Sequence, residues 1–190
     1  MAGEARHAVI GFPGGLRASL RWAGSGRAAE VFALTETGGP LVDHGELAVP
    51  DPDARCRAEI RLETPGGPWT VRLASTISDE PAGLVWDTEQ LFVVKYGFHV
   101  YAFTARTGEL RWVHRSASPV LVVIGSSRLP HVLVQAEVET FALEADGEVA
   151  WRVAHSDVVT EAELVGGRLV LTSFDGQVRA IDPLTGRGAT

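Results

Sequence analysis

Residues 91–112 read LFVVKYGFHVYAFTARTGELRW, and two later segments repeat their pattern. Residues 131–151 read HVLVQAEVETFALEADGEVAW, and residues 168–187 read RLVLTSFDGQVRAIDPLTGR. One glycine recurs in these segments at a constant interval, as Gly108, Gly147 and Gly186. A period of about 40 residues, made of short apolar strands, is typical of β-propeller blades, which are four-stranded sheets arranged around an axis.

Each repeat divides into four short strands, which we name a to d in chain order. In the first complete repeat they are expected at 83–86, 91–96, 99–104 and 109–114. The turn before strand d carries Thr-Gly or Asp-Gly, and glycine accepts a positive φ without steric cost, so a tight hairpin is expected there. Residues 136–145 (AEVETFALEA) are rich in helix formers, but the register of the repeat predicts a strand, because tertiary context commonly overrides propensity.

The first part of the chain, before the regular repeats, has a weaker pattern. Residues 31–38 (VFALTETG) echo strand c of the later repeats, and together with 16–22 and 41–47 they predict another blade. Residues 57–64 and 69–75 predict a hairpin that is too short for a full blade. We expect a single all-β domain over residues 1–190, a β-propeller or propeller-like array of about four to five small four-stranded blades. Its regular repeats, with a period of about 39 residues, occupy 82–187, and its divergent repeats occupy 1–81.

Charge and composition exclude several classes of function. The formal net charge is −7 and the arginines are scattered, whereas a nucleic-acid-binding surface needs massed positive charge to displace counterions. Cys56 is the only cysteine, so neither an intrachain disulfide nor a CxxC metal pair is available. The longest apolar run, Val120–Ile124, is far shorter than a membrane span, and the first residues lack a signal-peptide pattern. We expect a cytoplasmic protein that binds neither nucleic acid nor membrane.

One segment carries the repeat pattern in full. Residues 175–186 (DGQVRAIDPLTG) are similar to the pattern D-G-x-v-x-A-l-d-x-x-T-G-x-x-x-W of the quinoprotein-like β-propeller superfamily, and residues 100–112 are similar to its second part. The resemblance covers about residues 82–187. The superfamily includes pyrroloquinoline-quinone dehydrogenases and an outer-membrane assembly lipoprotein that only binds other proteins.

The resemblance implies the blade fold and no active site, because superfolds host many activities. The dehydrogenases typically carry a disulfide between adjacent cysteines beside the quinone, and they have many more blades than a chain of this length provides. A chain with Cys56 alone cannot form such a disulfide, so we expect no quinone and no other cofactor.

Candidate site residues gather where the b–c and d–a connections emerge on one face of the blades. The b–c connections would bring His99, Glu139 and Asp175 to this face, and His114, His155 and Asp157 would lie near the ends of strands d. Converging imidazoles and carboxylates could ligate a divalent metal. The candidate catalytic residues are therefore His99, His114, His155, Asp157 and Asp175. No HxH or HExxH spacing supports a metal site, so we assign no metal ligand; the alternative is surface side chains at strand ends.

Three further features have structural interpretations. Trp112 and Trp151 keep the same interval as the turn glycines, which favours packing between blades over a ligand-stacking platform. Residues 11–15 (GFPGG) precede neither a lysine nor a helical pattern, so they predict a turn rather than a phosphate loop. The aspartates at 43, 51 and 53 are assigned to turns rather than to a calcium site.

No catalytic constellation emerges, so the leading hypothesis is a non-enzymatic binding or scaffold module that presents propeller loops to a protein partner. Two alternatives remain, a metal-dependent hydrolase or lyase that uses the His/Asp-bearing face, and a carbohydrate-binding module that uses exposed aromatics. The last repeat reaches only strand c, whose edge would expose unpaired backbone groups. We expect one of two N-terminal segments, 7–12 (HAVIGF) in preference to 16–22 (LRASLRW), to pair with 178–181 and close the ring; otherwise the open edge would pair with a second chain and give a homodimer.

Overall fold

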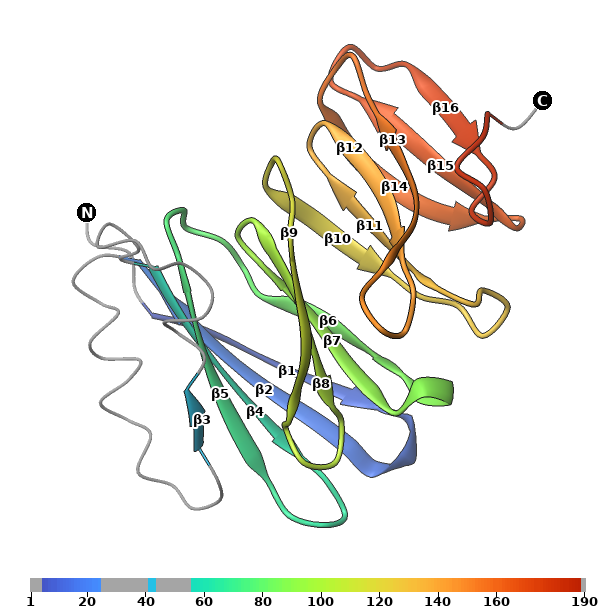
Figure 1. Cartoon of the computed structure of the whole chain (residues 1–190). Coiled ribbons are helices and arrows are strands. Elements are labelled where there is room, and N and C mark those ends of the chain that lie inside the picture. The colour runs from blue at the N-terminus through green and yellow to red at the C-terminus, as the bar shows by residue number, and fades with distance from the viewer. Residues whose placement is uncertain (1–4, 25–40, 44–55, 189–190) are drawn as a thin grey trace.

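Four β-sheets follow one another along the chain in the computed structural model, which describes residues 5–24, 41–43 and 56–188 (Figure 1). The helical elements of these ranges are two single-turn 3-10 segments, η1 (Pro13–Gly15) and η3 (Asp87–Glu89). No helix within the described ranges is long and apolar enough to cross a membrane. The prediction of an all-β, propeller-like array is confirmed, and we call each sheet a blade.

Blades two and three contain the four strands that the repeat predicts. Blade two consists of β6 (Ala82–Trp86), β7 (Leu91–Tyr96), β8 (His99–Thr104) and β9 (Leu110–Arg115). Blade three consists of β10 (Val120–Ile124), β11 (Val132–Ala136), β12 (Glu139–Leu143) and β13 (Val149–Ala154). The helix formers around β12 lie in a strand because β12 is hydrogen-bonded on both sides, to β11 and β13. Blade four has three strands among the described residues, β14 (Val159–Val165), β15 (Arg168–Ser173) and β16 (Val178–Ile181).

Blade one is assembled from the irregular part of the chain. β1 (Arg6–Phe12), β2 (Leu16–Ala23), β4 (Cys56–Glu63) and β5 (Trp69–Ser75) form an antiparallel ladder in that order, and β3 (Leu41–Asp43) adds to β5 in parallel. Its strands alternate apolar and polar residues. Leu20, Ile60 and Val71 lie opposite one another on the face that packs on blade two. The neighbouring row, Arg21, Glu59 and Arg72, faces the other way, so blade one turns a charged face away from blade two.

This blade confirms two predictions and extends one of them. Residues 57–64 and 69–75 form the expected antiparallel hairpin of β4 and β5, and β4 also pairs with β2 from Arg17↔Glu63 to Ala23↔Arg57, which places the hairpin in a larger sheet. The matching alternation of the two strands makes this pairing favourable, since it puts apolar residues on one face. Residues 11–15 form the expected turn between β1 and β2. The predicted strand at 31–38 and most of that at 41–47 lie outside the described residues.

The prediction that the N-terminal strand closes the ring is wrong. β1 pairs with β2 along its whole length, from Arg6↔Trp22 to Phe12↔Leu16, instead of pairing with residues 178–181. The physical reason is loop closure, because a single 3-10 turn joins β1 to β2 whereas most of the chain separates β1 from β16. Within the described ranges, β15 is the strand that neighbours β16.

Among the described residues, three apolar clusters hold the four blades together, one at each junction. The first joins blades one and two through side chains that include Trp69, Phe92 and Phe103. The second joins blades two and three through side chains that include Val93, Val100 and Phe141. The third joins blades three and four through Leu133, Ala142, Leu169, Leu171 and Ile181. Each sheet between two neighbours is therefore apolar on both faces, which explains the imperfect alternation of its strands.

One contact recurs at all three junctions, between a tryptophan and a turn glycine of the next blade. The indole Nε1–H groups donate hydrogen bonds of 2.9, 2.9 and 3.1 Å to carbonyl oxygens of the next c–d turn, as Trp69 to Ala105, Trp112 to Ala145 and Trp151 to Pro183. A Cβ on the glycine beneath each ring would lie 2.5–2.7 Å from ring atoms, at Gly108, Gly147 and Gly186. The predicted packing role of Trp112 and Trp151 is confirmed. Trp69 makes the same contact, but the sequence did not reveal it because Trp69 does not keep the constant interval to Trp112.

Replacing Gly147 by alanine should destabilise the protein more than the same change at Gly166. Both glycines have positive φ, +90° and +57°, so each alanine carries the left-handed backbone cost of about 1–2 kcal/mol. At Gly147 the new Cβ also lies 2.7 Å from Cγ of Trp112, whereas no described atom lies within 4 Å at Gly166. Overpacking should add about 1–3 kcal/mol to the loss of unfolding free energy in urea. Equal losses for Gly147→Ala and Gly166→Ala would contradict the proposed contact.

Candidate functional site

The loop face of the array, formed by the d–a linkers and the b–c turns, is built on a second repeat with the same interval as the turn glycines. Asp79, Ser118 and Asp157 each precede strand a of a blade, and each side-chain oxygen accepts a backbone N–H from the b–c turn of that blade. The donors are Gly97 at 2.7 Å, Val138 at 3.2 Å and Asp175 at 3.2 Å. Sequence reasoning missed this repeat, because its only signal is a short polar residue at constant spacing.

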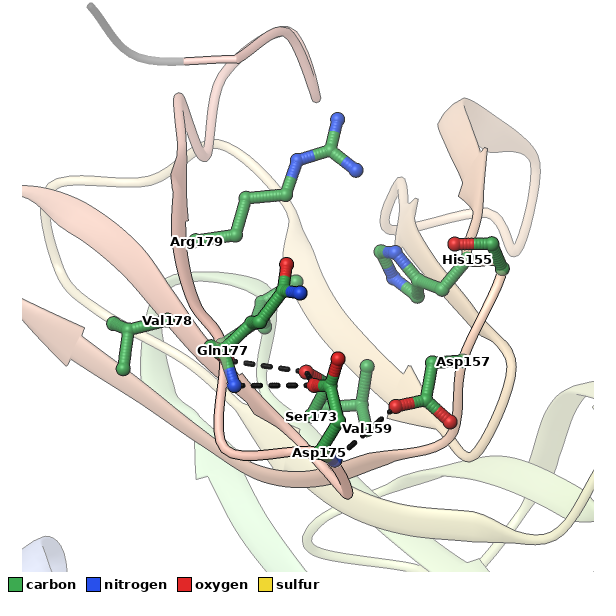
Figure 2. A pocket seen from close by; sticks show the side chains of 10 residues that line it. His155, Asp157, Val159, Ser173, Asp175, Gln177, Val178 and Arg179 are labelled. Atoms are coloured by element: carbon green, nitrogen blue, oxygen red, sulfur yellow. Dashed lines mark hydrogen bonds between the residues drawn. The ribbon is translucent and has the colours of Figure 1, made fainter.

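Three of the candidate residues, His155, Asp157 and Asp175, line one pocket of about 360 Å³ at the last junction (Figure 2). His155 and Asp157 come from the linker between β13 and β14, and Asp175 comes from the turn between β15 and β16. Further lining residues include Ser173, Gln177 and Arg179. The structure therefore brings together half of the residues that the sequence assigned to this face, and it places His99, His114 and Glu139 elsewhere.

The two carboxylates of this pocket are engaged in holding its walls. Asp175 Oδ1 accepts hydrogen bonds from the Ser173 hydroxyl at 2.5 Å and from the Gln177 N–H at 3.1 Å (Figure 2). The Ser173 hydroxyl is the main reason that the pKa of Asp175 is lowered, with the backbone N–H of Gln177 next. Asp157 accepts the N–H groups of Val158 and Asp175. Both side chains thus act as turn caps, which is the usual task of aspartate in tight loops.

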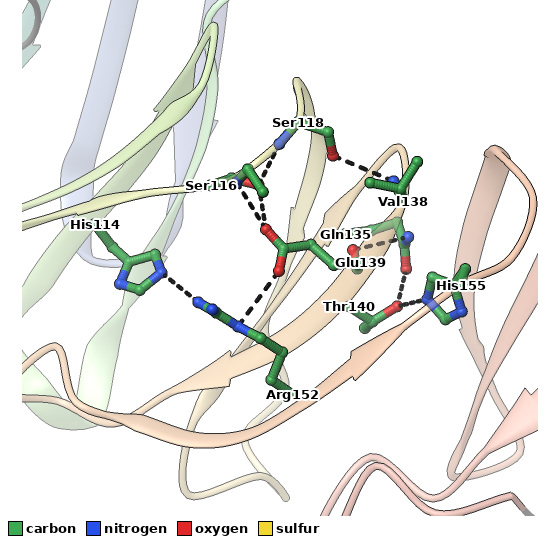
Figure 3. A network of polar contacts seen from close by, with 10 residues as sticks. His114, Ser116, Ser118, Gln135, Val138, Glu139, Thr140, Arg152 and His155 are labelled. Carbon is green, nitrogen blue, oxygen red and sulfur yellow. Dashed lines mark hydrogen bonds and ion pairs between the residues drawn. The ribbon is translucent and has the colours of Figure 1, made fainter.

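A buried carboxylate, Glu139, joins blades two and three at the adjacent junction (Figure 3). Its Oε1 accepts hydrogen bonds from the Ser116 hydroxyl at 2.8 Å and the Ala117 N–H at 2.9 Å, both in the linker that leads from β9. Its Oε2 lies 3.3 Å from Nε of Arg152. Both carboxylate oxygens of Glu139 therefore have partners, so its buried charge is compensated. Its hydrogen bonds to Ser116 and Ala117 hold the linker between β9 and β10 in place.

The two histidines beside Glu139 are held as neutral rings. Nε2 of His114 lies 3.1 Å from the Arg152 guanidinium, which can only donate, so this nitrogen accepts and the proton is on Nδ1. The Thr140 hydroxyl donates to Gln135 and lies 2.6 Å from Nε2 of His155, so this nitrogen donates (Figure 3). Burial lowers the pKa of both histidines, with neighbouring arginines as the second cause.

His99 is a buried residue of blade two rather than a member of the pocket. It is 6% exposed, its ring lies 5.9 Å from the ring of Tyr101, and its Nδ1 has no hydrogen-bond partner among the described residues. Burial lowers the pKa of His99 to about 4, and Coulombic interactions with Arg115 and then His114 lower it further. The candidate histidines are therefore spread over two junctions and one blade interior.

No group of three or more His, Cys, Asp or Glu side chains within the described residues could hold a metal ion. In the pocket, the Ser173 hydroxyl donates to Asp175 while Nε2 of His155 pairs with Thr140, so the described lining residues form no serine–histidine pair of the kind that activates a nucleophile.

The loop face also carries exposed apolar side chains that sequence reasoning missed. Phe174 is 81% exposed at the tip of the β15–β16 turn, and its N–H donates to the Val158 carbonyl oxygen at 2.8 Å. Val158 and Val138 are also exposed, and the Val138 carbonyl accepts the N–H of His155 in the same linker. We call Val138, Val158 and Phe174 the loop-face patch. The one signal in the sequence is an aromatic residue directly before the Asp175-Gly176 turn, where a polar residue is usual.

A family comparison supports the resemblance of the repeats to quinoprotein-like propellers. Residues 130–189, which contain β11 to β16, match the family model of the outer membrane protein assembly factor BamB. The match is confined to this segment, so it confirms the resemblance of the last repeats and not the membership of the whole chain. No curated protein matches the chain.

Solved structures share the arrangement of the strands at low sequence identity. BamB from Moraxella catarrhalis is 22% identical, over 63% of this chain and 39% of that chain, with a TM-score of 0.45. The computationally designed Ika8 protein is 14% identical, over 71% and 45%, with a TM-score of 0.54. HIRA(644–1017) is 13% identical, over 96% and 51%, with a TM-score of 0.51. The chain spans about half or less of these structures, and the last two support the fold alone.

The burial of His99 should lower the free energy of unfolding in acid. The unfolded chain takes up a proton at His99 near its ordinary pKa of 6.5, whereas the folded protein does so only near 4, so stability should fall as the pH drops from 6.5 to 4. The His99 contribution should be on the order of 3 kcal/mol. It is measured by urea unfolding of the protein and of His99→Gln at pH 7 and pH 4. Glutamine is a suitable substitute because Gln177 holds the equivalent place in blade four. An identical pH dependence of both proteins would refute this role of His99.

Proposed function

We propose that this protein is a non-enzymatic binding module that engages a protein partner through the loop face of blades three and four. The observation that carries the proposal is Phe174, an aromatic side chain that is 81% exposed beside a polar pocket. Large aromatic side chains do not gain stability from such exposure, and they are enriched where protein surfaces bind one another. The loop-face patch supplies an apolar centre, and the pocket supplies a polar rim.

The composition of the rim supports a protein ligand. Arg179, Gln177 and His155 line the pocket, and they offer guanidinium, amide and imidazole groups to a partner. An exposed aromatic anchor surrounded by such groups is the usual composition of an interaction hot spot. The segment match to BamB, an outer membrane protein assembly factor by its description, agrees with a role in protein assembly. It does not identify the partner of this chain.

The other two hypotheses find less support in the geometry. A hydrolase or lyase that uses the His/Asp-bearing face would need free acid–base groups, whereas Asp157, Asp175 and His155 are engaged with turn atoms and Thr140. A carbohydrate-binding module stacks sugar rings on exposed aromatic platforms, whereas Trp69, Trp112 and Trp151 pack on glycines of the next blade. Phe174 is exposed, but it is a single ring surrounded by the valines of the loop-face patch. We therefore propose protein binding as the function.

Phe174→Ser should abolish capture of the partner while leaving the fold intact. Affinity capture with the purified protein, read by quantitative mass spectrometry, should recover a protein that the Phe174→Ser variant loses. A central aromatic contributes about 2 kcal/mol or more, so the Kd of the purified pair should rise about 30-fold. The melting temperature should hardly change, because surface substitutions usually stay within about 0.5 kcal/mol.

Val165→Ser is the matched control. Val165 is also apolar and 54% exposed, but it lies at the end of β14 in the a–b turn, away from the loop face. This variant should capture the same partner as the parent protein. If Phe174→Ser captures the same set of proteins as the parent, the loop-face patch is not the binding site and the proposal fails.

A further inference from the structure

A second pocket lies between blades two and three, on the opposite side of the array from the loop face. It is formed by two a–b turns, which lie at the other end of strand b from the b–c turns of the loop face. One is η3, the green coil that joins β6 to β7 in Figure 1, and the other is residues 125–131, which join β10 to β11. The pocket has a volume of about 260 Å³, which is less than a drug-sized ligand needs, so it fits a single amino-acid side chain.

The floor of this pocket is apolar and contains an aromatic ring. Leu84, Val85 and Trp86 of β6 line it, and all three are half-buried. Trp86 packs against the apolar cluster that joins blades two and three. Its indole N–H has no hydrogen-bond partner among the described residues, whereas the N–H groups of the three junction tryptophans bind turn carbonyls. The part of the Trp86 ring that lines the pocket is therefore available to a ligand.

The wall that faces Trp86 is made of small residues. Gly125, Ser126 and Ser127 line it, directly after the end of β10. A Cβ at Gly125 would lie 3.1 Å from Cδ2 of Leu84, which is closer than ordinary van der Waals contact, so a side chain here would press on the floor of the pocket. The two serines leave space between the turns and add hydroxyl groups to the rim.

The rim of the pocket is acidic on the η3 side. Asp87 lines the pocket, Glu89 lies in the same turn, and both are exposed. The hydrogen bonds that Asp87 accepts, from the N–H and Nε2 of Gln90, both end on its main-chain oxygen. Within the described ranges neither carboxylate has a partner, and Arg128 of the facing turn is not paired with them. This rim attracts a cation, and the net charge of −7 on the whole chain adds to the attraction.

The turn that carries Asp87 is held in a fixed conformation. Gln90, which follows η3, has a φ of +56° and is the one residue other than glycine with a positive φ in the described ranges. Residues with a Cβ seldom adopt this conformation, so it needs support from its surroundings. The Gln90 N–H donates to the Asp87 carbonyl at 3.2 Å, and the Gln90 carbonyl accepts the Ala105 N–H at 2.9 Å. The main chain of Asp87 is therefore in place before a ligand binds, which reduces the entropy cost of binding.

From these observations we propose that the pocket between η3 and residues 125–131 binds an arginine side chain of a protein partner. The guanidinium plane stacks on the Trp86 ring, and its N–H groups donate to the Asp87 carboxylate. Arginine suits both contacts, because its charge is spread over a plane that stacks on aromatic rings and forms paired hydrogen bonds with carboxylates. Its methylene groups lie on the apolar floor. This site is on the other side of the array from the loop-face patch, so it goes beyond the function proposed above.

Two other ligands fit the pocket less well. A lysine side chain pairs with the carboxylate, but its ammonium group is strongly hydrated and offers no plane to Trp86. A sugar ring stacks on an indole, but as a neutral ligand it gains nothing from the negative charge of Asp87 and Glu89.

The test follows the indole N–H signals of the five tryptophans of the full chain by NMR while a probe is added. The probe is Nα-acetylarginine methylamide, and the Trp86 signal is identified with Trp86→Phe. We expect the Trp86 signal to shift saturably while the other tryptophan signals stay in place. The citrulline analogue has the same shape without the charge, and it should bind about tenfold more weakly because it loses the ion pair and the cation–π attraction. The lysine analogue should also bind more weakly than arginine.

Substitutions at the rim separate this pocket from the general charge of the chain. Asp87→Asn should weaken binding of the arginine probe about fivefold, as expected for a partly exposed ion pair. Glu161→Gln removes the same charge from an exposed position of β14 and should leave the affinity unchanged. Arg128→Ala should strengthen binding, because it removes a like charge from the facing turn. Phe174→Ser should leave the titration unchanged, so this proposal and the loop-face patch are tested independently.

Four results would overturn the proposal. The first is that no probe shifts the Trp86 signal, and the second is that the citrulline analogue binds as tightly as the arginine probe. The third is that methyl glucoside binds and the arginine probe does not, because the pocket would then be a sugar site. The fourth is that the probe binds Arg128→Ala and not the parent protein, because the chain's own arginine would then occupy the pocket.

Discussion

The array depends on the contact between the indole of one blade and the turn glycine of the next. The ring can lie on the turn only where no Cβ intervenes, and in that position its N–H reaches a carbonyl oxygen of the same turn. One side chain thus buries a large apolar area and satisfies a backbone acceptor across the junction. At the last junction His131 adds a second donor, since its Nε2 lies 2.7 Å from the Pro183 carbonyl and its ring meets Trp151 edge-on. The spacing of the blades follows from these contacts.

The polar groups of the loop face serve the same architecture. Asp79, Ser118 and Asp157 tie each linker to a b–c turn, and Glu139 orders the linker between blades two and three. Carboxylates and hydroxyls that are satisfied in this way have limited capacity for chemistry, because a reacting group needs a free proton or lone pair. What protrudes beyond them is apolar, and Phe174 protrudes most. A surface of this kind fits the binding module proposed above.

The two ends of the array differ in the residues that they present. The face of blade one that points away from blade two sets arginine beside glutamate in cross-strand register, so its charges are compensated. The outward face of blade four exposes Val178, whose counterparts Val100 and Thr140 are buried at a junction, together with Glu161 and Glu163 of β14.

The sequence alone determined the repeat, the strands of blade two to within about one residue, and the packing role of Trp112 and Trp151. These properties are local, because alternation, turn glycines and a constant interval are visible wherever a blade recurs. Only the tertiary structure decided that β1 pairs with β2, that β2 and β4 share a sheet, and that His155, Asp157 and Asp175 meet while His99 is buried. Pairing between distant strands and the exposure of a side chain depend on which blade covers which. Equivalent residues such as Val100 and Val178 have the same local pattern, and they differ in exposure because blade three covers the first and no described strand covers the second.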